Sequence, residues 1–321
     1  MKVGVLTVPL SGQPLPEALS YLRSLGVEAL EIGCGGYPGK GHCNPRELLE
    51  NKSKLKQFKE TIEEFGMPIS ALGCHGNMVN PDKEAAARYQ ADFDDALLLA
   101  EELEINKVLT FSGCPGDCPT AKYPNWVTCA WPDEYPKILD YQWNDVLIPF
   151  WIKQLEACRS HGVTKVALEM HPGFCVYNTE TMLKLRAAVG DTIGANFDPS
   201  HLLWQSVDPV VFCRDFIDRI YHVHAKDVKL NFDGRNGVLG SHLTFGNMNR
   251  GWNFVSLGHG DVDFDGICRA LNQGNYNGPI SIEWEDSGMD RVYGATEACE
   301  YIKKYNFNAS TFAFDSAIKT D

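Results

Sequence analysis

Eight short β-rich runs alternate with amphipathic helical stretches along the chain, and this pattern leaves few folds open. The strands are expected at residues 2–8, 29–33, 68–73, 107–112, 165–170, 193–198, 220–226 and 279–284. The clearest helical stretch, residues 86–103, places Phe93, Leu97 and Ala100 on one face. Strands that alternate with helices predict a parallel sheet, and eight units predict its closure into a (β/α)8 barrel. No G-x-G-x-x-G motif follows the first run, which argues against a dinucleotide-binding sheet.

Composition indicates an ordinary soluble protein that forms one domain over residues 1–321, with 44% hydrophobic and 22% charged residues. The net charge of −13 repels phosphate backbones, so we expect no nucleic-acid partner. No apolar run approaches the roughly 20 residues of a membrane helix, and the first residues resemble a strand rather than a signal peptide. Eleven cysteines without regular spacing indicate reduced thiols, so a cytoplasmic location is expected.

Two connections, residues 113–142 and 227–261, are too long to be simple joints between elements. The first is rich in tyrosine and tryptophan, and the second is rich in glycine and asparagine. Both follow predicted strands, so they belong to the carboxyl-end face where barrel active sites are built. Two interpretations stay open: these loops cover and bind a substrate, or they form an interface between subunits.

Polar side chains end each of the last four predicted strands. Glu169 ends the fifth, Asp198 the sixth, His224 the seventh and Glu283 the eighth. Parallel strands of a barrel bring their carboxyl ends to one rim, where a buried carboxylate persists only when it is paired or binds a cation. Three carboxylates and one imidazole predict one divalent metal ion, Mn²⁺ by preference, with Mg²⁺, Co²⁺ or Zn²⁺ as alternatives. Taken alone, Asp198 is equally a candidate cap for a following helix.

The strand ends and one later loop carry a resemblance to a known family. The segments are Leu168-Glu169-Met170-His171-Pro172, Phe197-Asp198-Pro199-Ser200-His201, His222-Val223-His224-Ala225-Lys226-Asp227, Gly258-His259-Gly260-Asp261-Val262-Asp263 and Ile282-Glu283-Trp284-Glu285-Asp286. In order and spacing they resemble the sugar-phosphate isomerase/epimerase-like group of xylose isomerase-like TIM barrels, which includes D-tagatose 3-epimerase, inosose dehydratase and 3-keto-sugar epimerases. The resemblance implies that Glu169, Asp198, His224 and Glu283 hold the metal, that both glutamates act as acid and base, and that His201 contacts substrate.

Such a site suits the removal of a proton from a carbon next to a carbonyl. The resulting enediolate is stabilised by a metal acting as a Lewis acid. Glu169 and Glu283 come from well-separated strands, so one can remove the proton and the other can return one on the opposite face. We therefore expect a metal-dependent sugar or keto-sugar epimerase or isomerase.

Other polar and aromatic residues receive supporting roles. His201, Lys226, Arg250 and Trp252 are the expected substrate contacts, with Lys226 neutralising developing charge. His75 is either a polar contact, a third acid-base group or a structural histidine. His171 and His222 are expected to orient the metal ligands.

Three alternative functions share this scaffold: a lyase, a repair nuclease and a sugar-binding barrel without catalysis, the last disfavoured because both glutamates are retained. A lyase begins with the same proton abstraction and then loses a β-substituent, as in inosose dehydration or 3-keto C-glycoside cleavage. A repair nuclease resembling endonuclease IV is disfavoured, because it requires further histidines and basic surface. A redox or thiolate role for Cys114 and Cys118 rests on one C-x-x-x-C spacing.

The expected partners follow from the chemistry and from the resemblance. The substrate is an unphosphorylated sugar or keto-glycoside, since no cradle rich in lysine or arginine is evident in the sequence. The resemblance implies a homo-oligomer, and some similar proteins pair with a small second subunit.

Overall fold

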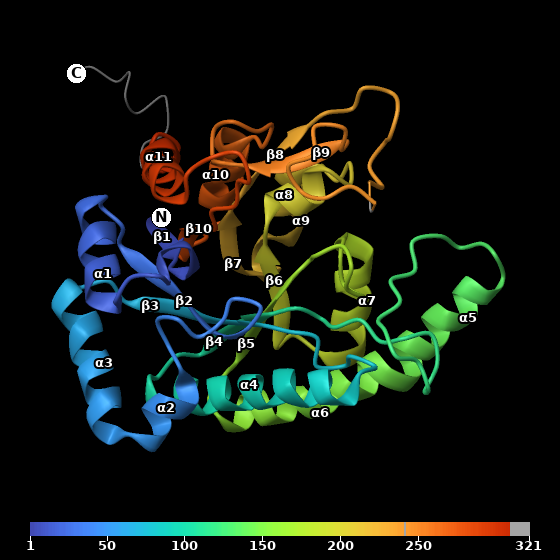
Figure 1. Cartoon of the computed structure of the whole chain (residues 1–321), viewed down its shortest axis with the longest axis horizontal. Helices are drawn as coiled ribbons and strands as arrows, with labels where there is room; N and C mark the ends of the chain where they lie inside the picture. Colours follow the sequence, from blue (N-terminus) through green and yellow to red (C-terminus); the bar gives the residue numbers. More distant parts are fainter. Residues whose placement is uncertain (241, 309–321) are drawn as a thin grey trace, which may run out of the picture.

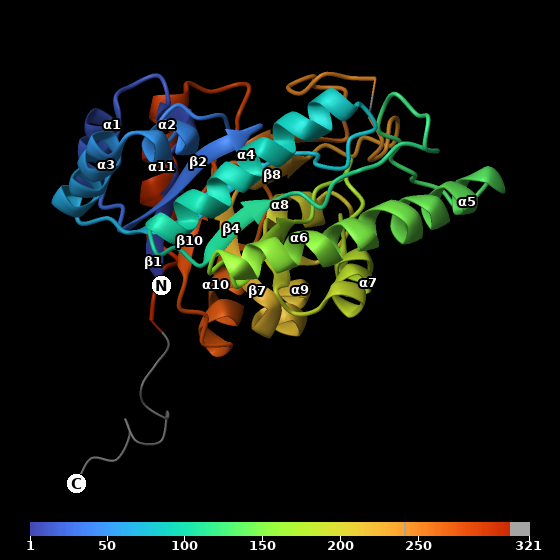
Figure 2. The same cartoon turned by 90° about the horizontal axis from the view of Figure 1, so that it is seen from below.

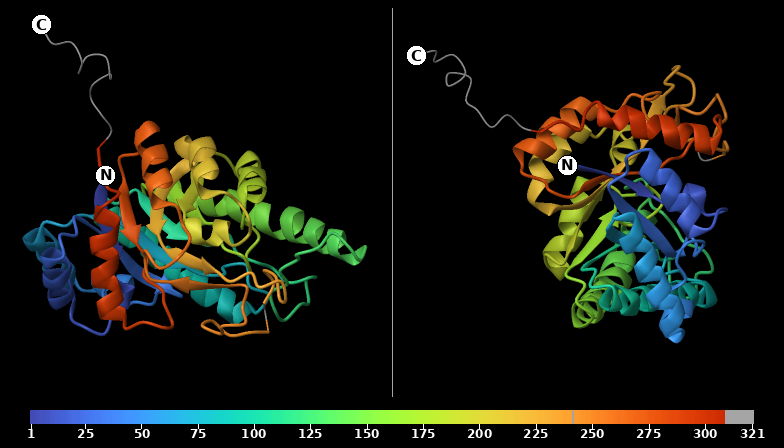
Figure 3. Two further views of the ribbon diagram at one scale, coloured as in Figure 1. Left: turned by 90° about the horizontal axis from the view of Figure 1, so that it is seen from above. Right: turned by 90° about the vertical axis from the view of Figure 1, so that its left-hand side faces the viewer.

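Eight parallel strands close into a barrel in the order β1-β10-β7-β6-β5-β4-β3-β2, with helices around the outside (Figures 1 and 3). The computed structural model describes residues 1–240 and 242–308. The barrel strands are β1 Lys2–Leu6, β2 Ala29–Gly36, β3 Ile69–His75, β4 Lys107–Thr110, β5 Lys165–Glu169, β6 Ile193–Phe197, β7 Ile220–Ala225 and β10 Pro279–Ile282. All eight predicted strands are confirmed, and so is the barrel.

Helices follow the strands and cover the outside of the barrel. They are α1 Leu15–Ser24, α2 Pro45–Glu50, α3 Lys52–Phe65, α4 Lys83–Glu102, α5 Glu134–Asp140, α6 Ile148–Ser160, α7 Thr179–Val189, α8 Pro199–Leu203, α9 Pro209–Phe216, α10 Phe264–Gln273 and α11 Arg291–Lys303, with the short helical segments η1 Val8–Leu10, η2 Tyr141–Leu147 and η3 Ile217–Arg219. Within the described ranges, no helix combines the length and apolar character needed to cross a membrane.

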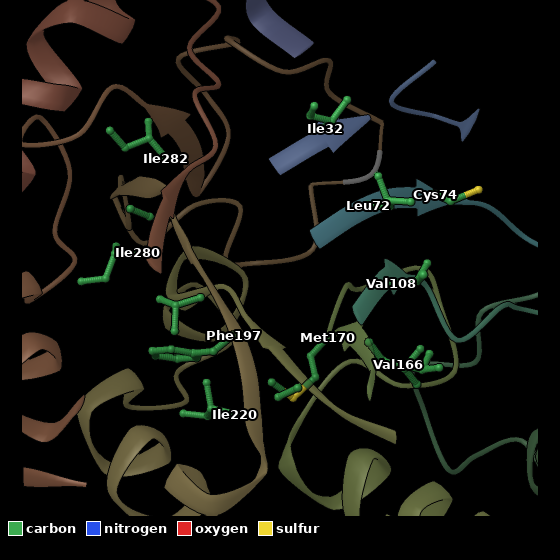
Figure 4. Close-up of a cluster of buried hydrophobic side chains, with 14 of the residues drawn as sticks. Ile32, Leu72, Cys74, Val108, Val166, Met170, Phe197, Ile220, Ile280 and Ile282 are labelled. Carbon is green, nitrogen blue, oxygen red and sulfur yellow. The ribbon is translucent and has the colours of Figure 1, made fainter. Parts of the chain in front are cut away.

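The two faces of each barrel strand differ in chemistry. On β2, Leu30 and Ile32 are fully buried in the main hydrophobic core, whereas Glu31 between them bonds His224 of β7. Strands β2 and β7 are not neighbours in the barrel, so Glu31 reaches His224 across the barrel interior. Since side chains alternate along a strand, Leu30 and Ile32 face the surrounding helices. Figure 4 shows further members of this outer core, contributed by strands around the barrel. The interior holds polar groups such as Glu31 together with a small cluster of Ala71, Leu109 and Ala167.

Both long loops carry structure that the sequence did not predict. In the second loop, β8 (Asp227–Leu230) pairs antiparallel with β9 (Trp252–Val255), which forms a ribbon beside the barrel. In the first loop, α5 continues through the π-helical η2 into α6, and it projects beyond the barrel (Figures 1 and 2).

One buried carboxylate organises the end of the second loop. The Oδ1 atom of Asp227 accepts backbone N–H groups from Val228 and Val262, and Oδ2 accepts those of Gly258 and Gly260. A Cβ at position 260 would collide with the Asp227 carboxylate, so glycine is required there. The motif of residues 258–263 therefore holds the end of this loop against Asp227 through backbone hydrogen bonds.

We expect Asp227→Ala to lower the free energy of unfolding by about 2–4 kcal/mol, because it strips four backbone donors of their acceptor. Urea denaturation of the purified chain measures the change. The control is Asp265→Ala, which removes only an exposed pair with Arg269 and is expected to cost under about 0.5 kcal/mol. Equal losses in the two variants would contradict this role for Asp227.

Candidate active site

Four potential metal ligands meet at the carboxyl-end rim of the barrel. Glu169 is the last residue of β5, His224 lies in β7, and Asp198 and Glu283 directly follow β6 and β10. One ligand atom from each lies within 4.8 Å of the others. Glu169, Asp198 and His224 are almost fully buried, and the side chain of Glu283 is 21% exposed. The structure thus brings together the quartet that the sequence predicted as ligands.

The donor set fits a divalent cation. Bonds of about 2.1 Å to one ion place ligand atoms at most roughly 4.2 Å apart, and the ligand atoms of this cluster all lie within 4.8 Å of one another. Asp198 divides its two oxygens: Oδ1 caps α8 by accepting the Ser200 N–H at 2.8 Å, whereas buried Oδ2 points into the cluster, 3.1 Å from the ammonium of Lys226. Buried carboxylates are costly unless cations balance them, and Lys226 brings one positive charge to the three carboxylates of the quartet. The cap and the ligand roles of Asp198 are therefore compatible.

Lys226 balances the negative charge of the cluster. Its Nζ lies 2.9 Å from Glu283 Oε2, 3.1 Å from Asp198 Oδ2 and 4.0 Å from Glu169 Oε1. Burial lowers the pKa of Lys226, but the three carboxylates raise it well above its usual value. Conversely, burial raises the pKa of Glu283, but Lys226 and His224 lower it to about 2. These groups are therefore charged at neutral pH, and the ionised form of Glu283 is the form that binds a cation.

Glu169 is surrounded by possible proton carriers. The Nε2 atom of His201 lies 3.0 Å from Glu169 Oε1, and that of His75 lies 3.2 Å from Oε2. Burial raises the pKa of Glu169, but these imidazoles and Lys226 lower it well below the ordinary range. The ring of His171 stands 4.2 Å from that of His201, and its Nδ1 bonds the Pro172 carbonyl. The individual roles of His75, His171 and His201 stay predictions, although the structure places all three histidines at the cluster.

Glu31 is a site residue that the sequence analysis missed. Its buried carboxylate accepts hydrogen bonds from Ser281 Oγ at 2.7 Å and from the Nε2 atoms of His222 and His224, both at 2.9 Å. A carboxylate only accepts, so Nε2 of His224 carries a proton toward Glu31, while Nδ1 faces the quartet 2.9 Å from Glu283. Burial lowers the pKa of His224, but Glu31 and Glu283 raise it well above its usual value, so a metal ion would take the place of a proton on Nδ1. Glu31 thereby orients a candidate metal ligand, and His222 contacts the same carboxylate. The one feature of the sequence that could have indicated this role is the position of Glu31 between Leu30 and Ile32 in an apolar strand.

Two cavities are lined in part by residues of the cluster and its neighbours. One, of about 240 Å³, is lined by His75, Glu169 and Glu283 together with residues that follow β1 and β2. The other, of about 390 Å³, is lined by His201 and by aromatic residues of the long loops. Arg250 and Trp252 line this second cavity. The cavities show that a molecule larger than the metal ion fits beside the quartet.

The cysteine pair of the first long loop lies apart from this chemistry. Cys114 is buried and Cys118 is exposed, and both are free thiols. Among the described residues, the groups able to hold a metal consist of histidine and carboxylate side chains. A redox or metal role for the pair gains no support from this arrangement.

The fold and the strand-end site identify the chain as a member of the xylose isomerase-like TIM barrel family, whose model matches residues 19–305. It is 36% identical over 313 residues to the uncharacterized protein YfiH of Bacillus subtilis (strain 168), covering 95% of this chain and 99% of that protein. It is also 29% identical over 175 residues to inosose dehydratase of Clostridium tetani (strain Massachusetts / E88), covering 54% of this chain and 57% of that enzyme.

Solved structures agree on the fold. The probable 3-DHS dehydratase AsbF of Bacillus anthracis superposes with a TM-score of 0.66 at 18% identity, over 97% of this chain and 100% of that one. The IOLI protein with a bound zinc atom superposes with a TM-score of 0.64 at 18% identity, over 95% of this chain and 96% of that one. An L-ribulose 3-epimerase superposes with a TM-score of 0.61 at 17% identity, over 95% of this chain and 94% of that one. The fold thus houses both dehydratases and epimerases.

We expect a divalent metal to raise the thermal stability of the protein through this quartet. An ion that binds only the folded chain adds about 2.7 kcal/mol when present at 100 times its Kd, which is roughly 5 °C in Tm for a chain of this size. Thermal melts of chelator-treated protein with and without Mn²⁺ measure the shift. Asp198→Asn is the matched variant, because asparagine caps a helix as well as aspartate does but is a poorer metal ligand. A shift of equal size in that variant would place the stabilising ion elsewhere.

Proposed function

We propose that the chain is a divalent-metal-dependent enzyme that removes a proton next to the carbonyl of a sugar or keto-sugar. The observation that carries this proposal is the pair Glu169 and Glu283. Both carboxylates are ionised, both belong to one cluster of candidate ligands, and their strands lie three positions apart around the barrel. Two bases on different sides of one binding point are what proton removal and return require.

The chain's own groups supply each part of this chemistry. Glu169 or Glu283 takes the proton from carbon, and Lys226, within 4.0 Å of both, holds positive charge where the enediolate oxygen develops negative charge. His201 and His75 contact Glu169 and can donate to substrate oxygens. When bound, the metal supplies Lewis-acid polarisation of the carbonyl, and nitrogen and oxygen donors of this kind favour Mn²⁺ with Mg²⁺, Co²⁺ or Zn²⁺ as alternatives.

Two outcomes share this first step. Return of a proton to the opposite face of the carbon by the second glutamate gives an epimer. Loss of a β-substituent, with a proton delivered to it by a histidine beside Glu169, gives an unsaturated ketone and a released alcohol or water. The sequence similarity to inosose dehydratase favours this second outcome, whereas the glutamate pair itself serves either.

Product analysis tests the proposal and separates its outcomes. Metal-loaded protein is incubated with ketohexoses, inososes and methyl 3-keto-β-D-glucoside, and the reactions are followed by NMR and ultraviolet absorbance. A new epimer supports the isomerase, and an enone absorbance with released methanol or water supports the lyase. Absence of any change in all three substrate classes, with the metal bound, would refute proton abstraction from keto-sugars.

A further inference from the structure

Two buried cysteines on neighbouring loops lie next to each other and take no part in the proposed proton chemistry. Cys114 follows β4, and Cys175 follows β5, the next strand around the barrel. The Cys175 N–H donates to the Gly113 carbonyl at 2.9 Å, so the peptide groups that precede the two cysteines are bonded to each other. The Val176 N–H donates to Ser112 Oγ, also at 2.9 Å, and keeps the two segments in register. Segments paired in this way bring their side chains within the reach of a disulfide, which joins Cα atoms about 4.4–6.8 Å apart.

The two thiols contact each other and differ in acidity. A hydrogen bond from the Cys175 thiol lowers the pKa of Cys114 by more than burial raises it, and the backbone of Asn125 lowers it further. The same hydrogen bond and burial raise the pKa of Cys175 well above its usual value. Cys114 is therefore the thiol that ionises first and attacks, and Cys175 is the protonated partner beside it.

The Cys175 segment continues directly into the wall of the candidate active site. The preceding residue, Phe174, stacks on Phe111 with ring centroids 4.2 Å apart. Phe111 in turn packs edge-on against His171 at 5.0 Å and lines the cavity of about 240 Å³ at the quartet. A covalent bond between Cys175 and the loop after β4 therefore fixes a segment that packs against the candidate site.

A second pair of neighbouring thiols, Cys34 of β2 and Cys74 of β3, offers a comparison. A hydrogen bond with Cys74 lowers the pKa of Cys34, but burial and the nearby Cys43 and Asp92 raise it above its usual value. The same bond and burial raise the pKa of Cys74. Both residues also lie on strands whose backbones are held by the barrel ladder. Neither thiol ionises readily or moves freely, so we expect this pair to stay reduced where Cys114 and Cys175 react.

We propose that hydrogen peroxide converts Cys114 and Cys175 into a reversible intramolecular disulfide, a modification that is separate from the proposed function. The Cys114 thiolate attacks a peroxide oxygen, the S–O bond forms, the O–O bond breaks, and the departing hydroxide takes up a proton and leaves as water. The Cys175 sulfur then attacks the sulfenic acid on Cys114, so that the S–S bond forms, the S–O bond breaks and a second water carries away the Cys175 proton. Two thiols are thereby oxidised, and one peroxide is reduced to two waters.

Burial determines both the oxidant and the effect of the bond. Cys114 is 1% exposed and Cys175 is 5% exposed, so a molecule as small as hydrogen peroxide reaches them more readily than a bulky disulfide does. A cross-link between the loops after β4 and β5 restricts the unfolded chain and stabilises the folded one. We expect a Tm roughly 5 °C higher in the oxidised protein. We also expect amide hydrogen exchange about tenfold slower in residues 112–114 and 171–176.

The test uses the Cys118→Ser/Cys129→Ser variant as the parent, because these two exposed thiols would otherwise form bonds between molecules. The folded parent is treated with hydrogen peroxide, its remaining thiols are alkylated under denaturing conditions, and its peptides are identified by mass spectrometry. We expect a peptide pair joined through Cys114 and Cys175, the loss of two free thiols and the rise in Tm, all reversed by dithiothreitol. Thermal melts and hydrogen exchange of the same samples measure the effect of the bond on the fold.

Three variants of this parent make the result specific. Cys175→Ser keeps a hydroxyl donor beside Cys114 but cannot complete the bond, so dimedone is expected to trap a sulfenic acid on Cys114. Cys114→Ser is expected to leave Cys175 unmodified. Cys34→Ser removes a buried thiol elsewhere and is expected to form the disulfide as the parent does. A bond between Cys34 and Cys74 in place of the expected one would overturn the proposal. So would the absence of a Cys114–Cys175 link at peroxide concentrations that oxidise exposed Cys118 of the unsubstituted chain.

Discussion

Replacing Glu169 or Glu283 by glutamine is expected to lower turnover of the keto-sugar substrate about 10³-fold, because a glutamine neither accepts nor returns the substrate proton. Each variant keeps the size of its parent and an oxygen able to contact the metal. Turnover is measured at saturating Mn²⁺, so that the loss falls on kcat rather than on metal occupancy. Steady-state kinetics with circular dichroism of the same samples separate loss of chemistry from loss of fold.

The control for this pair is Glu156→Gln, which lies exposed on α6 and is expected to retain full turnover. Loss of activity in only one glutamine variant would indicate a single base and a different proton donor. His75 and His201 are the candidates for that donor, because both lie close to Glu169. Full activity in both variants would contradict the assignment of the two glutamates.

Glu31→Gln is expected to raise the Kd for Mn²⁺ by about 10–100-fold, because Glu31 holds His224 in the tautomer that offers Nδ1 to the quartet. A glutamine accepts through one oxygen only and presents an NH₂ group to the imidazoles. Isothermal titration of metal-free protein with Mn²⁺ measures the Kd directly and does not depend on any substrate.

Ser281→Ala is the matched control for Glu31. It removes another hydrogen bond to the same carboxylate but leaves the contact between Glu31 and His224 intact. We expect its Kd for Mn²⁺ to stay within about threefold of the parent value. Unchanged Mn²⁺ affinity in Glu31→Gln, with the fold retained, would show that His224 needs no such partner.

The barrel and the clustering of Glu169, Asp198, His224 and Glu283 were predictable from sequence for the same physical reason. Parallel strands of a barrel end at one rim, so four strand ends that each carry a ligand-type residue predict one cluster without knowledge of the helices. The sequence left two interpretations of Asp198 open, a cap of the following helix or a metal ligand; the structure shows the cap and also places Asp198 in the cluster of candidate ligands.

Glu31 and the β8–β9 ribbon were missed because their partners are distant in sequence. Glu31 meets His224 across the barrel, 193 residues away, and local periodicity contains no information on such a contact. Likewise Asp227–Leu230 pairs with Trp252–Val255 across a long connection, so no short hairpin turn signalled the ribbon. The aromatic cavity depends on both long loops and on α8 at once, and so it too required the tertiary structure.

The most direct test of the account is solvent deuterium exchange into a substrate keto-sugar. Protein loaded with Mn²⁺ and the same protein after chelation are incubated with methyl and phenyl 3-keto-β-D-glucosides in D₂O, and NMR follows the carbons next to the carbonyl. The account predicts deuterium at one of these carbons with metal-loaded protein, and none above background after chelation or in Glu169→Gln. Exchange that is equally fast without the metal, or no exchange when the metal is bound, would contradict metal-dependent proton abstraction by this site.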